Sequence, residues 1–382
     1  MKIMKKIFLI VLTFLTINSF GQGISINYDI DTNVHKVAEP LNLWLNFLKT
    51  KDDSLGSKYW NTEEVNKYGK NSYFLIENEL QFGMDNYLKL LSYTEINILS
   101  IKKIDKYYKI TSIMKFKQKD NVSNINYIFH VYAGYENKKL KLYNPLEINT
   151  KLYLSSSTVG FIKFHYPKSH KFNYTIAKKQ NDFIVQLSNN FNVLIDSIDY
   201  YFAPTYDEVL KIRGFDFLIG ESGIQIPTGK ADVKNRIAYS AGLAEYYPHE
   251  LIHIILNPHY KNCHLWINEG VATYFGMSRG KELDWHLKKM TKHLIKHPEI
   301  NLNKMLTLKH LDQYTDYRYA LGGFIIKMIY KEGGYELIKE IMTAGKKDME
   351  FYKAIEKYLG IKQNELFTST HSKISSYTLI YP

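Results

Sequence analysis

Apolar and polar residues follow two different periods in the N-terminal part of the chain. Apolar positions at helical spacing predict a helix over residues 36–49, with Pro40 near its start. Residues 98–117 and 124–143 alternate every second position instead, which predicts half-buried strands, and residues 136–139 (Glu-Asn-Lys-Lys) predict a turn. Helical sequence followed by strands indicates an α+β module.

We assign this module to residues 22–156. Its order of a helix followed by strands resembles the cystatin-like or NTF2-like fold, in which a curved antiparallel sheet wraps around helices. The resemblance rests on element order alone. It implies a fold but no activity, because no cluster of catalytic side chains stands out in these residues.

From residue 157 onwards, the patterns alternate between strand and helix. We predict strands over 160–167 and 195–204, and helices over 172–191 and 206–214, the last closed by Gly214. Residues 235–240 predict a further strand, at a sheet edge with which a peptide can pair. Residues 281–297 and 324–342 are amphipathic and predict a mostly helical C-terminal half. We therefore assign a second α+β domain to residues 157–382.

The first residues of the chain combine a basic start with a short apolar run. Three lysines precede the run from Ile7 to Leu15, and small and polar residues follow it. This pattern predicts a signal peptide over residues 1–21, with cleavage before Gln22, and hence a secreted or periplasmic protein. The run is short for a membrane span, so we predict no stable membrane insertion. A short anchor helix that stays uncleaved is the alternative.

Charge and cysteine content narrow the classes of function. The formal charge of +12 includes three lysines of the predicted signal peptide, and +9 remains without them. The other lysines are scattered, and the densest run, at 103–119, fits the solvent face of strands, so we predict no binding to nucleic acid. The single cysteine, Cys263, allows no intrachain disulfide. We interpret it as a packing residue rather than a nucleophile.

The stretch at 248–256 (PHELIHIIL) places three ionisable side chains in an apolar run. On a helix, His249 and His253 lie one turn apart on one face and can bind one metal ion, while Glu250 stands beside them without being a ligand. Pro248 places the start of the helix close to itself, because only the first turn tolerates proline. The pattern predicts a zinc site that needs a third protein ligand and leaves a position for water.

The first candidate for the third ligand is Glu269, in the segment WINEGVATYF. HELIH followed by this segment resembles the gluzincins, the zinc peptidases that include thermolysin and a family of aminopeptidases. The resemblance covers residues 246–275 closely and the rest of the second domain in outline. It implies that His249, His253 and Glu269 bind Zn²⁺ and that Glu250 acts as the general base.

Other interpretations of the same stretch remain open. His259 stands at the spacing of the metzincin motif HExxHxxGxxH, but that motif has glycine where this chain has Leu256, and leucine resists a positive φ. We therefore rank Glu269 above His259, and His264 and Cys263 below both. Without a metal, both motif histidines would be core residues, and Glu269 would respond to a helix dipole.

The predicted ligand set implies a defined chemistry. Zinc bound in this way lowers the pKa of a bound water and polarises a carbonyl oxygen. Glu250 would accept the water proton and later deliver it to the leaving amine. The oxyanion needs a further donor. The resemblance to the aminopeptidases points to Tyr319, with Tyr317 behind it, although packing is an equal alternative among 32 tyrosines.

One departure from the aminopeptidases limits the functional prediction. Their GxMEN segment, which recognises a free amino terminus, does not occur upstream of the motif. We therefore expect an endopeptidase, or a peptidase with one protein partner, acting on a peptide or protein substrate. Two alternatives stay open: an exported binding protein that keeps the zinc site for structure, and a zinc hydrolase with a substrate other than a peptide.

Overall fold

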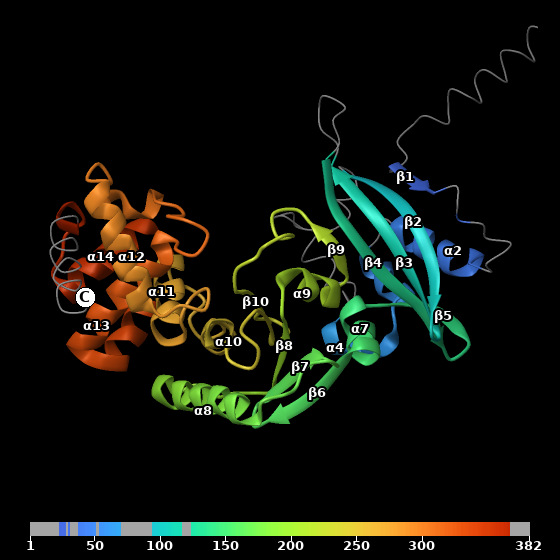
Figure 1. Ribbon diagram of the computed structural model, residues 1–382, viewed down its shortest axis with the longest axis horizontal. Coiled ribbons are helices and arrows are strands. Elements are labelled where there is room, and N and C mark those ends of the chain that lie inside the picture. Colours follow the sequence, from blue (N-terminus) through green and yellow to red (C-terminus); the bar gives the residue numbers. More distant parts are fainter. Residues whose placement is uncertain are drawn as a thin grey trace, which may run out of the picture. The chain divides into compact units, whose positions relative to one another are not determined.

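The structure is a computed structural model that describes residues 23–27, 30, 37–50, 53–69, 94–116 and 124–366. The predicted signal peptide lies outside these residues. The described chain forms two compact units, coloured along the sequence in Figure 1. The first contains the described residues up to Leu152 together with Leu210–Ser222, and the second contains the others.

This division differs in two ways from the domains expected from sequence. The boundary lies between Leu152 and Tyr153 rather than at 156/157. Leu210–Ser222, which we expected in the second domain, belongs to the first unit. The reason is that β9 (Phe215–Leu218) pairs antiparallel with β4 (Asn124–Glu136). This long-range pairing has no counterpart in the local sequence pattern.

The first unit is built on a largely antiparallel sheet. Its strands follow the order β1–β2–β3–β4–β5, with β9 also paired to β4. The bounds are Gly23–Ile26 for β1, Thr94–Ile104 for β2, Tyr107–Phe116 for β3 and Lys139–Tyr143 for β5. The helices are α2 (Ala38–Leu48), α3 (Asp53–Gly56), η2 (Ser57–Tyr59), α4 (Thr62–Tyr68) and α7 (Pro145–Tyr153). The predicted turn between β4 and β5 is confirmed, with positive φ at Asn137 and Lys138.

Helix α2 packs on this sheet and confirms the helix predicted from the N-terminal pattern. Pro40 lies in its first turn, where no intrahelical donor is lost. The buried Trp44 donates its indole N–H to the Ser112 hydroxyl of β3 over 3.2 Å, and its ring lies 6.2 Å from that of Phe129 on β4. The packing agrees with the expected α+β class. The finer resemblance to a cystatin-like or NTF2-like fold stays a prediction.

A buried acid in the first unit predicts a pH-dependent stability. Burial raises the pKa of Glu64 on α4 from 4.5 to about 8, although Asn144 donates two hydrogen bonds to its carboxyl group, of 2.8 and 2.9 Å. The folded state therefore favours the protonated acid. Its stabilising effect is complete below pH 4.5 and is lost as the pH rises through about 8.

We expect Glu64→Gln to remove most of this dependence, because Gln stays neutral and can still accept from Asn144. For wild type, the free energy of unfolding should fall by several kcal/mol, in order of magnitude, across that pH range. Urea titrations at several pH values measure this fall. Glu63→Gln, on the exposed face of the same helix, is the control and should behave as wild type. Equal slopes for wild type and Glu64→Gln would contradict the assignment.

The second unit contains a mixed sheet in the order β10–β11–β8–β7–β6. The bounds are Leu154–Val159 for β6, Ile162–Pro167 for β7, Ile198–Ala203 for β8, Thr228–Asp232 for β10 and Ile237–Ala241 for β11. Helix α8 (Tyr174–Phe191) follows β7, and α9 (Tyr206–Arg213) leads into the first unit. The structure thus confirms the two strands and the two helices that we predicted between residues 160 and 214.

The edge of this sheet is not the strand that we expected. The segment at 235–240 forms β11, which pairs with β8 on one side and β10 on the other. All five residues of β11 are buried, in keeping with an interior strand. The edge strand beside β11 is β10, whose sequence Thr-Gly-Lys-Ala-Asp lacks apolar alternation and gave no strand signal; β6 forms the opposite edge.

Helices follow the sheet and confirm the mostly helical C-terminal half. They are α10 (Pro248–Leu256), α11 (Leu265–Gly276), α12 (Leu283–Lys296), η3 (Leu302–Thr307), α13 (Tyr317–Met342), α14 (Asp348–Leu359) and η4 (Gln363–Glu365). Helices α8 and α10–α14 share one hydrophobic core with the sheet. In the part of the chain that the structure describes, no helix combines the length and apolar content needed to cross a bilayer.

Two glycines bring α11 and α13 into backbone contact. A Cβ atom placed on Gly270 would lie 2.5 Å from the carbonyl oxygen of Gly322, which is too close for any side chain. Gly270 directly follows Glu269, and Gly322 lies one turn after Tyr319. The close approach therefore fixes the helix that carries the predicted third ligand against the helix that carries the predicted oxyanion donor.

Candidate metal centre

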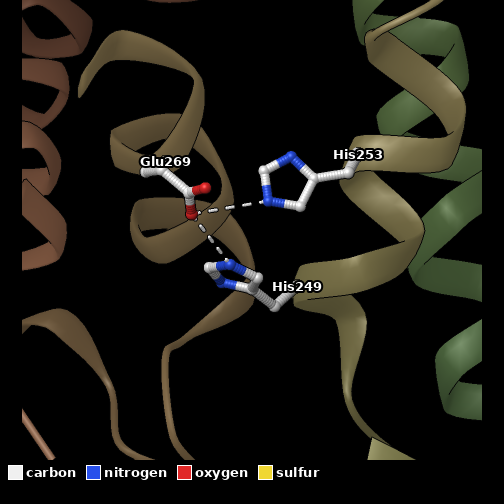
Figure 2. A group of neighbouring side chains, drawn as sticks. All are labelled: His249, His253 and Glu269. Carbon is white, nitrogen blue, oxygen red and sulfur yellow. Dashed lines mark ion pairs between the residues drawn. The ribbon is translucent and has the colours of Figure 1, made fainter. Parts of the chain in front are cut away.

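The three predicted ligands lie together in the second unit. The Glu269 Oε2 atom is 3.3 Å from His249 Nε2 and 3.5 Å from His253 Nε2. One ligand atom from each residue lies within 4.8 Å of the other two. Figure 2 shows the carboxylate pointing from its helix toward both imidazoles on the facing helix. Glu269 thus faces the same point as two histidines that precede it by 16 and 20 residues in the sequence.

Helix α10 positions the two histidines. Pro248 occupies its first turn, as predicted, and the N–H of Tyr247 before it donates to Gln180 of α8 over 2.6 Å. The remaining apolar residues of α10 are all buried: Leu251, Ile252, Ile254, Ile255 and Leu256. Burial of these faces fixes the rotation of the helix. The rings of His249 and His253, 5.0 Å apart between centroids, therefore share the face that looks toward α11.

Helix α11 supplies the carboxylate. His264 caps its first turn by accepting a hydrogen bond from the N–H of Trp266, and Glu269 follows about one turn later. At its other end, a Cβ atom on Gly276 would lie 2.9 Å from the backbone nitrogen of His249. Both ends of α11 are thus held, and its last turn lies directly against the start of α10.

The tautomer of His249 is set by the backbone. Its Nδ1–H donates to the carbonyl oxygen of Met277 over 2.6 Å, so Nε2 is the ring nitrogen that faces the ligand cluster. His253 Nδ1 is buried and has no hydrogen-bond partner within the described ranges. Its Nε2 also faces Glu269. Both imidazoles therefore offer Nε2 toward the same point.

The pKa shifts of the cluster are those of a buried carboxylate beside two imidazoles. Burial alone would raise the pKa of Glu269, but the charges and hydrogen bonds of His253 and His249 outweigh it and hold that pKa well below its usual range. Burial opposes a charge on His253 as well, yet Glu269 raises its pKa to about 9. The buried carboxylate thus retains a positive charge beside it as a proton. A divalent ion would replace that proton.

This donor set fits zinc. Two neutral imidazole nitrogens and one carboxylate oxygen are the ligands of open, catalytic zinc sites, in which the fourth position is taken by water or substrate. The tautomer imposed by Met277 is the one that metal-binding histidines adopt, with the second ring nitrogen hydrogen-bonded to the protein.

Glu250 lies outside the ligand cluster but beside it. The residue is only 7 % exposed, and burial raises the pKa of its carboxyl group. It faces the edge strand: a Cβ atom on Gly229 of β10 would lie 2.8 Å from Glu250 Oε1. Only glycine leaves room for the carboxyl group there. The predicted base therefore lies next to the backbone of β10.

The structure distinguishes the two candidate tyrosines at the start of α13. The Tyr319 ring lies edge-on to His249, with 5.8 Å between centroids, and burial raises the pKa of Tyr319 to about 12. It is therefore protonated at neutral pH and can donate. Tyr317 is 5 % exposed and belongs to the hydrophobic core. Of the two tyrosines, Tyr319 is therefore the one that lies next to the ligand cluster.

The competing ligands do not join the cluster, which contains none of the three. His259 is exposed in the turn after α10. His264 is engaged as the cap of α11 and by Asp348, 3.3 Å away. Burial raises the pKa of Cys263 to about 12, so its thiol stays protonated and inert. The residue arrangement favours Glu269 as the third ligand.

Sequence reasoning missed the segment Met277–Gly280, which follows α11. Met277 fixes the tautomer of His249, and the charge of Arg279 contributes to the pKa values of Glu250 and Tyr319. The composition Gly-Met-Ser-Arg-Gly is a turn signal, and it could have marked a loop at the site. Comparisons with protein-family models and with curated proteins returned no match for this chain.

Proposed function

We propose that the chain is an exported zinc metallopeptidase that hydrolyses peptide bonds. The observation that carries this proposal is the convergence of His249, His253 and Glu269, with a buried Glu250 beside them. The resemblance of these segments to the gluzincins supports the same reading. The predicted signal peptide motivates export, and the peptide or protein substrate is proposed from the chemistry of the site.

The three ligands, Glu250 and Tyr319 each have a role in the proposed reaction. Zinc bound by the three ligands would lower the pKa of a water molecule and polarise the substrate carbonyl. Glu250 accepts a proton from the attacking water and passes it to the nitrogen of the leaving amine. Its raised pKa brings the carboxyl group nearer to the range in which both transfers proceed at neutral pH. The Tyr319 hydroxyl donates a hydrogen bond to the developing oxyanion.

The edge strand provides a path for the substrate. A peptide that pairs with the outer edge of β10 would run past Gly229 and hence past Glu250. Backbone hydrogen bonds would hold it without regard to its side chains. Strand addition of this kind suits an endopeptidase, because it requires neither end of the substrate.

The role of Tyr319 gives a testable prediction. Tyr319→Phe should lower kcat by about 10²–10³-fold, the cost of one oxyanion donor, and leave the zinc content unchanged. Tyr317→Phe, two residues earlier and in the core, is the matched control and should retain activity. Steady-state kinetics with one peptide and elemental analysis measure both quantities. Equal activity of the two variants would assign Tyr319 a packing role.

A cleavage assay tests the proposed function as a whole. The mature chain, loaded with zinc, is incubated with a mixture of unstructured peptides, and the products are identified by mass spectrometry. We expect cleavage that stops with a chelator and returns with added zinc. If zinc binds and stabilises the fold while no peptide is cut, the chain is instead a binding protein with a structural metal site.

A further inference from the structure

The segment Met277–Gly280, which we call the Arg279 loop, has an unusual backbone. Met277 has φ 67°, Arg279 has φ 50° and Gly280 has φ 70°. Two of these residues carry side chains that disfavour the left-handed region. Such conformations persist only where the surroundings enforce them, and they concentrate at functional sites. The backbone of the Arg279 loop therefore has the strain that is typical of functional segments.

The surroundings of the Arg279 loop hold it rigidly. Ser278 and Lys281 exchange two backbone hydrogen bonds, of 2.9 and 2.8 Å. The fully buried His286 on α12 donates from Nε2 to the Ser278 carbonyl over 3.0 Å, and its Nδ1 lies 3.1 Å from the Thr315 hydroxyl. The position of Arg279 is thus fixed before any ligand arrives.

The loop also contacts the catalytic groups. Its Met277 carbonyl accepts a hydrogen bond from His249 Nδ1, on one of the predicted metal ligands. The Arg279 guanidinium donates to the hydroxyl of Thr228, the first residue of β10. Thr228 adjoins Gly229, which faces the Glu250 carboxyl group. The Arg279 guanidinium therefore contacts the residue that precedes Gly229, and Gly229 faces the proposed general base Glu250.

Arg279 differs from the other arginines of the chain. The sequence contains four, among 50 basic residues. Arg213, Arg236 and Arg318 each lie between 3.4 and 3.6 Å from a carboxylate oxygen. For Arg279, no carboxylate of the described residues lies within ion-pair distance. A rigid cation beside the site thus lacks an acidic partner from the described residues.

We propose that Arg279 binds a carboxylate of the substrate, within one or two residues of the scissile bond. This inference rests on the proposed peptidase function and names its substrate class. A strand advances about 3.4 Å per residue, so a peptide on β10 brings groups next to the scissile bond within reach of Thr228 and its guanidinium partner. The planar guanidinium can bind a carboxylate through two parallel hydrogen bonds.

The carboxylate can come from an acidic side chain or from a free C-terminus, and the peptides distinguish the two. One arm compares peptides blocked at both ends, made of alanine and phenylalanine with a single Glu or Gln moved along the sequence. The other arm compares neutral peptides with a free or an amidated C-terminus. We expect kcat/KM to be about tenfold higher for the carboxylate member in one arm. Ratios near one in both arms overturn the proposal.

Variants assign the preference to Arg279. Arg279→Gln should reduce the ratio of kcat/KM between the paired peptides to about one. Arg279→Lys should keep part of this preference, because lysine retains the charge but lacks the planar guanidinium group. Lys281→Gln removes an exposed charge two residues away and should keep the full ratio. Each ratio is taken within one protein, so a general loss of activity cancels. A full ratio in Arg279→Gln would contradict the proposal.

Binding separates this proposal from the proposed function. Glu250→Gln, loaded with zinc, is titrated by calorimetry with the same peptides, and Kd is compared within each pair. About tenfold tighter binding of the carboxylate member, lost in the double variant with Arg279→Gln, supports the carboxylate site even if wild type cuts nothing. Equal or undetectable binding of both members overturns it, even if wild type cuts neutral peptides.

Discussion

Glu250→Gln should lower kcat for peptide hydrolysis by about 10²–10⁴-fold, the usual contribution of a general base, without releasing zinc. Glutamine keeps the shape of the side chain but cannot accept the water proton. Glu250 lies outside the ligand cluster, so the metal content should equal that of wild type. Because burial already disfavours the charged form of Glu250, a neutral amide should also leave the stability equal or slightly higher.

Three measurements on one preparation test this prediction: cleavage rate, zinc per chain and thermal unfolding. Glu282→Gln makes the same chemical change at an exposed position before α12 and should keep full activity. The decisive result is loss of activity at full zinc occupancy. Full activity of Glu250→Gln would rule out the general-base role and with it the proposed mechanism.

Glu269→Ala should abolish stoichiometric zinc binding, whereas His259→Ala should retain it. The first removes one of three converging donors, and the second removes an exposed imidazole outside the cluster. Wild type should carry about one zinc per chain. Elemental analysis after reconstitution and dialysis gives the content of each protein. Loss of zinc in His259→Ala alone would mean that His259 is the third ligand, at the spacing of the metzincin motif.

Stability gives a second measure of the same site. An ion that binds only the folded state adds about 4 kcal/mol at a concentration a thousandfold above its Kd. Zinc should therefore raise the unfolding temperature of wild type and of His259→Ala, and have little effect on Glu269→Ala. Glu269→Gln is the isosteric variant: it keeps the volume of the buried side chain, so a lost response there reflects the ligand rather than a cavity.

The sequence predicted the local elements of the second unit well, since strong periodic patterns dominate there. Helix α8 begins two residues after its predicted start and ends at its predicted last residue. Helix α10 begins at Pro248, as expected. The strand at 235–240 was found but wrongly placed at the edge. Strand order depends on pairing between distant segments, and the true edge strand, β10, carries no apolar alternation to announce it.

For the candidate site too, the sequence predicted the local features, whereas the distances between segments required the structure. The spacing of His249 and His253 defines their common face on any helix, and the motif supplied Glu250 and the resemblance that suggested Glu269. Nothing local shows that Glu269 Oε2 lies 3.3 and 3.5 Å from the two imidazoles. That distance depends on the packing of α11 against α10, where Gly276 allows the close approach.

The sequence by itself determined the helix of the motif, its two histidines and the identity of the candidate base. Only the tertiary structure showed which of the candidate third ligands lies beside the two histidines, which tyrosine lies next to this cluster, and that the Arg279 loop contacts it. The physical reason is that periodicity encodes which face of a helix is buried, whereas the partner of that face is chosen by packing between segments far apart in the chain. Met277 and Arg279 reach the site through a backbone carbonyl and a strained loop, and neither feature has a signature in residue spacing.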